Sequence, residues 1–189
     1  MLAGEISPSG RLPISIEARP EDNPAYDNYY VEEPMTKRGH STLNVTYGEG
    51  IFVGYRGYEK NDVSPLYPFG YGLTYTSFEY SDLMVSEKGD GVDVTLTVTN
   101  TGNFDAAEVV QIYVGEDNPC VARPAKELKG YDKVFIPKGE SAVVTVRLPR
   151  SAFAFYDVDI HDWRINPGSF TIMVGASSQD IKLKEHIIL

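Results

Sequence analysis

Apolar and polar residues alternate with a two-residue period through residues 91–100. The apolar positions are Val92, Val94, Leu96 and Val98. Successive side chains of a strand point to opposite faces, so this spacing predicts a strand with one face buried and the other in water. The segment from Asn100 to Asn103, which contains Gly102, then supplies a turn.

Similar short runs follow one another from residue 78 to the end of the chain. They cover residues 78–86, 91–100, 108–115, 129–136, 141–148, 153–158, 169–175 and 181–189. Seven or eight short strands at this spacing, separated by Gly- and Pro-containing turns, are typical of an all-β antiparallel sandwich of the immunoglobulin or fibronectin type III kind. We expect Tyr156 and Trp163 to be core or edge anchors of that sandwich.

The first 77 residues do not share this pattern. Residues 6–16 contain a turn and one short predicted strand, while residues 17–42 are acidic, contain several prolines and show little periodicity. A segment of this composition cannot bury enough apolar surface to order itself. We therefore expect it to be mobile or to lie across a surface supplied by another part of a protein.

The chain of 189 residues has a formal net charge of −10 and a pI near 4.7. This balance argues against nucleic acid as a partner, because binding the phosphate backbone requires a basic patch. No apolar run reaches the roughly eighteen residues of a membrane span, and residues 1–5 lack the basic start and apolar core of a signal peptide. The sequence leaves the cellular compartment undetermined.

Cys120 is the single cysteine, so no disulfide can form within the chain. The three histidines, His40, His161 and His186, lie far apart and lack the spacing of a zinc site. We therefore expect no metal site and no cofactor.

Four blocks of the sequence resemble the C-terminal region of glycoside hydrolase family 3, the β-glucosidase-like enzymes. They are SPSGRLPIS at residues 7–15, YGEGIFVGYRGYE at residues 47–59, PLYPFGYGLTYTSF at residues 65–78, and ELKGYDKV at residues 127–134, the last followed by FAFYD at 153–157 and PGSF at 167–170. The blocks occur in the family's order and extend over nearly the whole chain. The resemblance implies three parts: the end of an α/β sandwich domain at 1–16, an irregular connector at 17–77, and a fibronectin type III-like domain at 78–189.

The resemblance also implies a function. In the family, an aspartate nucleophile lies in an N-terminal barrel domain, and a glutamate acid/base usually lies in the α/β sandwich domain. Neither motif has a counterpart here, so we expect no catalytic residue in this chain and no activity from it alone. Its expected partners are those two domains of a parent enzyme that hydrolyses terminal β-linked sugars, and carbohydrate would be bound only through that parent.

Two residues of the second block, Glu49 and Arg56, are possible neighbours of the substrate cleft in such an enzyme. Glu49, Glu59 and Asp62 together could also suggest a carboxylate cluster, but a carboxylate beside Gly50 and Arg56 more often satisfies backbone donors or an arginine than performs chemistry. Two other functions remain open on the sequence alone: a free-standing carbohydrate-binding module, and a subunit that complements a separately encoded catalytic chain.

The third block belongs to the segment PLYPFGYGLTYTSFEY, residues 65–80, which carries six aromatic rings. Pro68, Gly70 and Gly72 argue against a helix, because proline removes a backbone donor and glycine adds backbone freedom. We interpret this aromatic segment as an interdomain hinge. We predict that several of its rings are more exposed than core aromatics.

Overall fold

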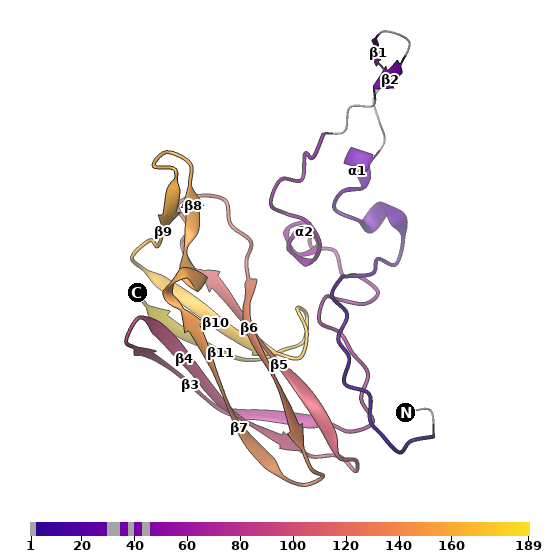
Figure 1. Ribbon diagram of the computed structural model, residues 1–189, viewed down its shortest axis with the longest axis vertical. Helices are drawn as coiled ribbons and strands as arrows, with labels where there is room; N and C mark the ends of the chain where they lie inside the picture. The colour runs from indigo at the N-terminus through magenta and orange to yellow at the C-terminus, as the bar shows by residue number, and fades with distance from the viewer. Residues whose placement is uncertain (1–2, 30–34, 38–39, 43–45) are drawn as a thin grey trace.

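A computed structural model describes residues 3–29, 35–37, 40–42 and 46–189. Its main body is a sandwich of two antiparallel sheets (Figure 1), with strand orders β11-β10-β5-β6 and β3-β4-β7. The strands are β3 (Phe78–Lys88), β4 (Gly91–Asn100), β5 (Ala106–Glu116), β6 (Glu127–Ile136), β7 (Ser141–Pro149), β10 (Ser169–Gly175) and β11 (Ile181–Ile188). The predicted all-β sandwich of about seven strands is confirmed.

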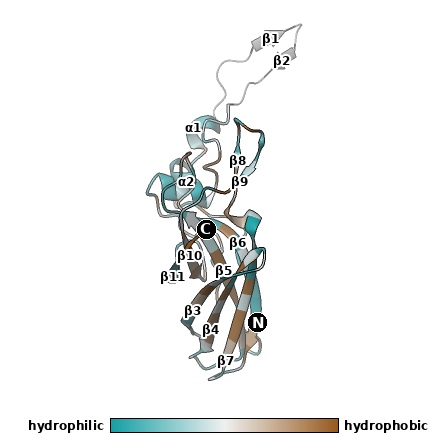
Figure 2. Cartoon of the chain, turned by 90° about the vertical axis from the view of Figure 1, so that its left-hand side faces the viewer, coloured by the Kyte–Doolittle hydropathy of each residue, from teal (hydrophilic) through white to brown (hydrophobic). Residues whose placement is uncertain are grey.

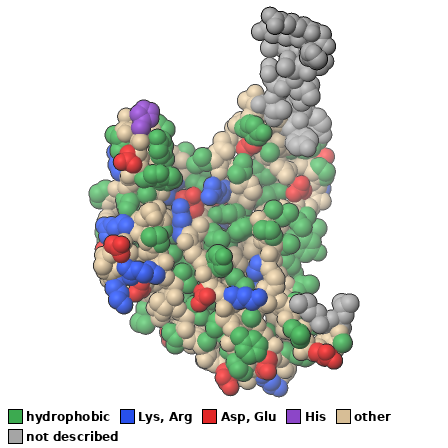
Figure 3. Space-filling view, viewed as in Figure 1, with side chains coloured by type: hydrophobic (Ala, Val, Ile, Leu, Met, Phe, Trp, Pro, Cys, Tyr) green, Lys and Arg blue, Asp and Glu red, His purple; other side chains and the backbone are tan. Residues whose placement is uncertain are grey.

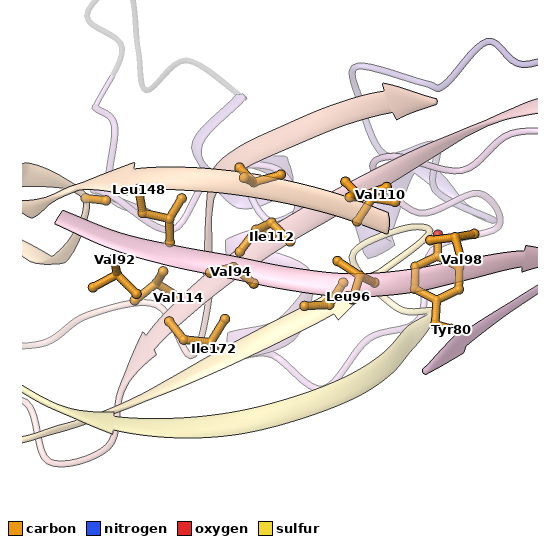
Figure 4. Packing of buried hydrophobic residues seen from close by; sticks show 14 of the residues in the cluster. Tyr80, Val92, Val94, Leu96, Val98, Val110, Ile112, Val114, Leu148 and Ile172 are labelled. Carbon is orange, nitrogen blue, oxygen red and sulfur yellow. The ribbon is translucent and has the colours of Figure 1, made fainter. Parts of the chain in front are cut away.

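The core lies between the two sheets and is built from the inward-facing residues of each strand. The alternating valines and leucine of β4 are buried, and β4 pairs with β7 so that Val94 lies opposite Val146. Apolar residues of β5 and β10, including Ile112 and Ile172, complete the packing from the other sheet (Figure 4). The two-residue period therefore identified the buried face of β4 correctly.

Shorter elements lie outside the sandwich. They are a 3₁₀ turn at Pro20–Asp22, α1 (Tyr26–Tyr29), β1 (Met35–Lys37), β2 (His40–Thr42), α2 (Tyr55–Lys60), a second 3₁₀ turn at Arg150–Phe153, β8 (Phe155–Asp157) and β9 (Asp162–Arg164). The short strand predicted within residues 6–16 is reduced to one isolated bridge between Ile16 and Tyr67. Within the segment expected to be mobile or to lie across another surface, residues 30–34 and 38–39 lie outside the described residues.

The expectation for Tyr156 and Trp163 was wrong. These two residues belong to a separate hairpin, β8–β9, and their side chains are 48% and 67% exposed. The 3₁₀ turn after β7 buries Phe153 completely against Phe170, at 5.3 Å between ring centroids, and the chain leaves the sandwich there. Alternation predicts a strand but does not say which sheet the strand joins.

The hairpin and the helices α1 and α2 of the connector lie at the same end of the molecule (Figures 1 and 2). Figure 2 shows hydrophobic residues concentrated in the sandwich strands, while α1 and α2 are largely hydrophilic. None of the helices in the described part of the chain has the length and apolar composition needed to cross a membrane.

Candidate functional site

The N-terminal segment, residues 7–16, runs alongside the aromatic segment, although some 60 positions separate them. The backbone N–H of Leu12 donates to the carbonyl of Tyr71, and the N–H of Gly70 donates to the carbonyl of Leu12, both at 2.8 Å. Ile16 and Tyr67 exchange a pair of backbone hydrogen bonds at 2.8 and 3.0 Å. The two segments thus form one ribbon, which we call the paired connector.

A buried glutamine fixes the paired connector to the outer face of the four-stranded sheet. The side-chain amide of Gln111, in β5, donates to the carbonyl oxygens of Gly70 at 3.1 Å and Ala176 at 2.6 Å. Its own carbonyl accepts a hydrogen bond from the hydroxyl of Tyr113 at 2.6 Å. Gly70 has a φ of +83°, and a Cβ at this position would overlap the Gln111 side chain. The contact therefore requires glycine.

Aromatic stacking holds α2 against the same face of the sheet. The Tyr55 ring stacks on Phe69 with centroids 4.9 Å apart and meets Tyr113 edge to face at 6.1 Å. The hydroxyl oxygen of Tyr55 accepts the backbone N–H of Leu128, in β6, at 3.0 Å. Polar and aromatic side chains together therefore join α2, the aromatic segment and the sandwich.

A buried ion pair ties the N-terminal segment to the sandwich. Arg11 donates from Nη2 to both oxygens of Glu108, at 2.9 and 3.0 Å, and the hydroxyl of Tyr80 donates to the same carboxylate at 3.1 Å. The Glu108 side chain is only 3% exposed. Burial and the Glu108 charge both raise the pKa of Tyr80 above its ordinary value, because each disfavours a phenolate there.

Large apolar side chains remain exposed on the paired connector, at the adjoining Ile6, and on the loop that precedes α2. They are Ile6, Ile14, Ile16, Tyr47, Ile51, Val53, Leu66, Tyr67, Leu73 and Tyr75. An apolar groove of about 640 Å³ is lined by residues of both segments of the ribbon, among them Leu12, Tyr71 and Leu73. Hydrophobic side chains gather on the flank of this lobe that faces away from the hairpin (Figure 3). We call the surface formed by these exposed side chains and the groove the connector face.

The rings of the aromatic segment are exposed to the degree that we predicted. Of its six rings, Tyr80 alone is buried, and Tyr67 and Tyr75 are 40% and 41% exposed. The predicted exposure of several rings is therefore confirmed. Extended apolar exposure of this kind marks a surface that binds another macromolecule or another domain.

The possible cleft neighbours Glu49 and Arg56, and Glu59 of the considered carboxylate cluster, have separate partners, while the backbone N–H of Asp62 donates to the carbonyl of Glu59 at 3.2 Å. Glu49 accepts a hydrogen bond from the side-chain amide of Asn28 at 2.6 Å, whereas Arg56, in α2, lies 3.4 Å from a carboxylate oxygen of Glu127. Glu59 forms an ion pair with Lys126. The structure therefore does not gather these residues around one centre.

A charged cluster that the sequence did not reveal lies beside α2. Arg123 is 6% exposed and contacts Glu116 at 2.8 Å and Glu127 at 3.0 Å. Burial alone would raise the pKa of Glu127, but Lys129, Arg123 and Arg56 together outweigh it and lower that pKa. Arg123 lies in a loop without a recognisable motif, so only the fold could bring these charges together.

Carboxyl groups with clearly shifted pKa values all change in the same direction. Within the described residues these are Glu17, Asp22, Asp90, Asp117 and Glu127, and hydrogen bonds or nearby cations lower the pKa of each. A carboxylic acid that donates a proton near neutral pH needs the opposite shift. Among the described residues, no group of three or more His, Cys, Asp or Glu side chains is arranged to hold a metal ion.

Comparison with known proteins gives a family model and close relatives. The model of the fibronectin type III-like domain matches residues 108–178. Over 99% of its length the chain is 42% identical to thermostable beta-glucosidase B of Acetivibrio thermocellus, and over 97% it is 47% identical to probable beta-glucosidase K of Emericella nidulans. It is also 44% identical, over 96% of its length, to an exo-alpha-(1->6)-L-arabinopyranosidase of Bifidobacterium breve.

The same relationship appears among solved structures. The crystal structure of a GH3 beta-glucosidase from Bifidobacterium adolescentis superimposes on the whole chain with a TM-score of 0.88 and 43% identity. The chain covers 27% of that structure, and 24%, 21% and 23% of the three relatives above. It therefore spans about a quarter of the length of the proteins it matches.

Proposed function

Because the chain belongs to glycoside hydrolase family 3, as the C-terminal region of its β-glucosidase-type enzymes, we propose that it is a non-catalytic region that braces the catalytic domains of a parent enzyme. The parent would hydrolyse terminal β-linked sugars. The expected partners are the barrel and α/β sandwich domains, which supply the nucleophile and the acid/base in this family.

The connector face is the observation that carries this proposal. Ile14 and Leu73 are 60% and 65% exposed, in a ribbon that is otherwise well fixed by hydrogen bonds. Burying a large aliphatic side chain contributes about 1.5–3 kcal/mol, so leaving these residues in water forgoes a large stabilisation. Contact with a catalytic domain would recover it.

Within this proposal, the three parts suggested by the sequence have separate roles. Residues 1–16 would complete the α/β sandwich domain, residues 17–77 would connect it, and residues 78–189 would form the fibronectin type III-like domain. Glu49 and Arg56 would lie near the substrate cleft of the assembled enzyme. Their bonds to Asn28 and Glu127 would then orient them rather than activate them.

We do not expect the region to determine which sugar the parent cleaves. Its identity to a beta-glucosidase, 42%, is almost the same as its identity to an arabinopyranosidase, 44%. Sugar selection would therefore reside in the catalytic domains.

The proposal is tested by the double variant Ile14→Ser/Leu73→Ser in the full-length enzyme. We expect a lower temperature of inactivation with an unchanged KM, because the substitutions weaken an interdomain contact and leave the chemistry alone. Val143→Ser is the matched control, since Val143 is 71% exposed on β7. Equal stability of the double variant and the parent would refute the proposal.

The subunit alternative shares this surface and differs only in how the chains are joined. Co-expression with a separately encoded catalytic chain would then restore activity that neither chain shows alone. The carbohydrate-binding module has less support, because the exposed rings of Tyr156 and Trp163 stand at 78° to each other and so do not form a flat platform.

A further inference from the structure

The β8–β9 hairpin exposes a second group of apolar side chains. Tyr156, Val158, Ile160 and Trp163 are 48%, 69%, 57% and 67% exposed within one short excursion from the sandwich. We call these four side chains the hairpin tip. Isolated exposed apolar residues are normal on a protein surface, but four of them on one short projection indicate a contact site.

Polar contacts hold both the foot of the hairpin and its two strands. Arg123 donates to the carbonyl oxygens of Phe153 at 3.2 Å and Ala154 at 3.4 Å, where the chain leaves the sandwich. Arg164, in β9, forms an ion pair with Asp157, in β8, at 3.0 Å. A preorganised element loses little conformational entropy when it binds.

The same charges join the hairpin to the connector. Arg123 contacts Glu127, and Glu127 contacts Arg56 in α2, so one chain of ion pairs links the foot of the hairpin with α2. The surface is hollowed between the hairpin and the connector lobe (Figure 3). The hairpin and α2 therefore lie on opposite sides of this hollow, at one end of the molecule.

We propose that the hairpin tip is a second docking point for the catalytic part of the same polypeptide, in addition to the connector face. This inference rests on the proposed function. A stable complex between separate proteins buries about 800 Å² on each partner, which four side chains cannot supply. A covalently attached partner needs less area, because attachment raises its effective concentration.

The size of the relatives supports this choice of partner. The chain covers about a quarter of each, as with 24% of thermostable beta-glucosidase B, so most of such an enzyme lies outside this chain. A sugar ligand fits the hairpin tip less well, because the two rings meet edge to face and aliphatic Val158 and Ile160 extend beyond them.

Trp163 offers a direct readout because it is the only tryptophan in the chain. We would measure its oxidation by hydroxyl radicals, using peptide mass spectrometry, in the 189-residue chain and in the full-length enzyme. We expect severalfold slower oxidation in the full-length enzyme. Met84, which is 62% exposed on β3, is the internal control and should oxidise at the same rate in both.

Tyr67 of the connector face separates this inference from the proposed function. Protection of Tyr67 with no protection of Trp163 would overturn the second docking point and leave the bracing role intact. Protection of neither residue would overturn both.

Cellotetraose added to the 189-residue chain tests the sugar explanation. Unchanged oxidation of Trp163 supports docking to protein, whereas dose-dependent protection would replace our proposal with a sugar-binding tip. As a second measurement, Trp163→Ser in the full-length enzyme should lower the inactivation temperature, while Val143→Ser should not. Equal inactivation temperatures for the two variants would count against the docking point.

Discussion

Arg11 binds Glu108 through two hydrogen bonds, at 2.9 and 3.0 Å, across 97 positions of the chain. The carboxylate is buried at one end of the sandwich core, where Tyr80 also donates to it. The first segment of the chain is therefore bonded into the sandwich, although the intervening connector contributes little core of its own.

Breaking this pair should be costly. Arg11→Met would leave the Glu108 carboxylate buried without its cation, and such a loss typically destabilises a protein by about 3–5 kcal/mol. Arg11→Lys should cost less, because it keeps the charge but loses the forked geometry. Urea unfolding followed by circular dichroism measures both. A change below about 1 kcal/mol for Arg11→Met, the range of exposed ion pairs, would show that the pair is solvated.

Gly70→Ala should weaken the attachment of the paired connector. The new methyl group would overlap the Gln111 side chain, and the positive φ of Gly70 adds backbone strain of roughly 1–2 kcal/mol. Gly139→Ala is the matched control, because Gly139 has a φ of +77° and open space around it. Thermal unfolding should show a larger loss at Gly70 than at Gly139. Equal losses would mean that Gln111 moves aside freely.

Stability should fall above pH 10. Burial is the main cause that raises the pKa of Tyr58, Tyr80 and Tyr113 above the ordinary 10.0, so these phenols stay protonated in the folded state. The unfolded chain loses those protons above pH 10, and unfolding then becomes more favourable as the pH rises. Below pH 10 the contribution is fully present.

Phenolate absorbance and circular dichroism, followed together during an alkaline titration, measure this dependence. Tyr80→Phe should make the decline of stability with pH shallower, whereas Tyr131→Phe, at an exposed ring, should not. Ionisation of Tyr80 well before unfolding would contradict the burial argument.

The sequence predicted the sandwich well because its information is local. Val92 and its alternating neighbours specify a strand and its buried face, and glycine-containing turns mark where strands end. The sequence also carried a sign of the connector contact. Glu108 and Gln111 are polar residues in the interior of a largely apolar strand, and both are buried with partners far away in sequence. Those partners could not be named from the sequence, because only the fold brings them close.

The exposure of the β8–β9 hairpin could not be predicted from the sequence. Tyr156 and Trp163 are large aromatic residues, and from this character alone we expected them to be core or edge anchors of the sandwich. They are exposed because the 3₁₀ turn directs the chain out of the sandwich. Arg123, which lies in a loop some 30 residues earlier in the sequence, binds the backbone carbonyl oxygens at that turn. Neither the turn nor the contacts of Arg123 produce a periodic pattern in the sequence.

Arg123→Lys should loosen the hairpin without unfolding the sandwich. Lysine cannot reach two carboxylates and two carbonyl oxygens together, so chymotrypsin should cut near Tyr156 or Trp163 several times faster. Arg147→Lys is the control, because Arg147 forms exposed ion pairs with Asp90 and Asp93. Identical cleavage rates in the two variants would show that Arg123 does not hold the hairpin.

We propose that this region supports catalysis without performing it. Retaining glycosidases need two carboxyl groups about 5–5.5 Å apart, one of them with a raised pKa. The direct test is the rate at which the purified 189-residue chain hydrolyses an aryl β-glucoside. We predict a rate equal to that of buffer alone. Saturable hydrolysis that copurifies with the chain and is lost in Glu49→Gln would contradict the account.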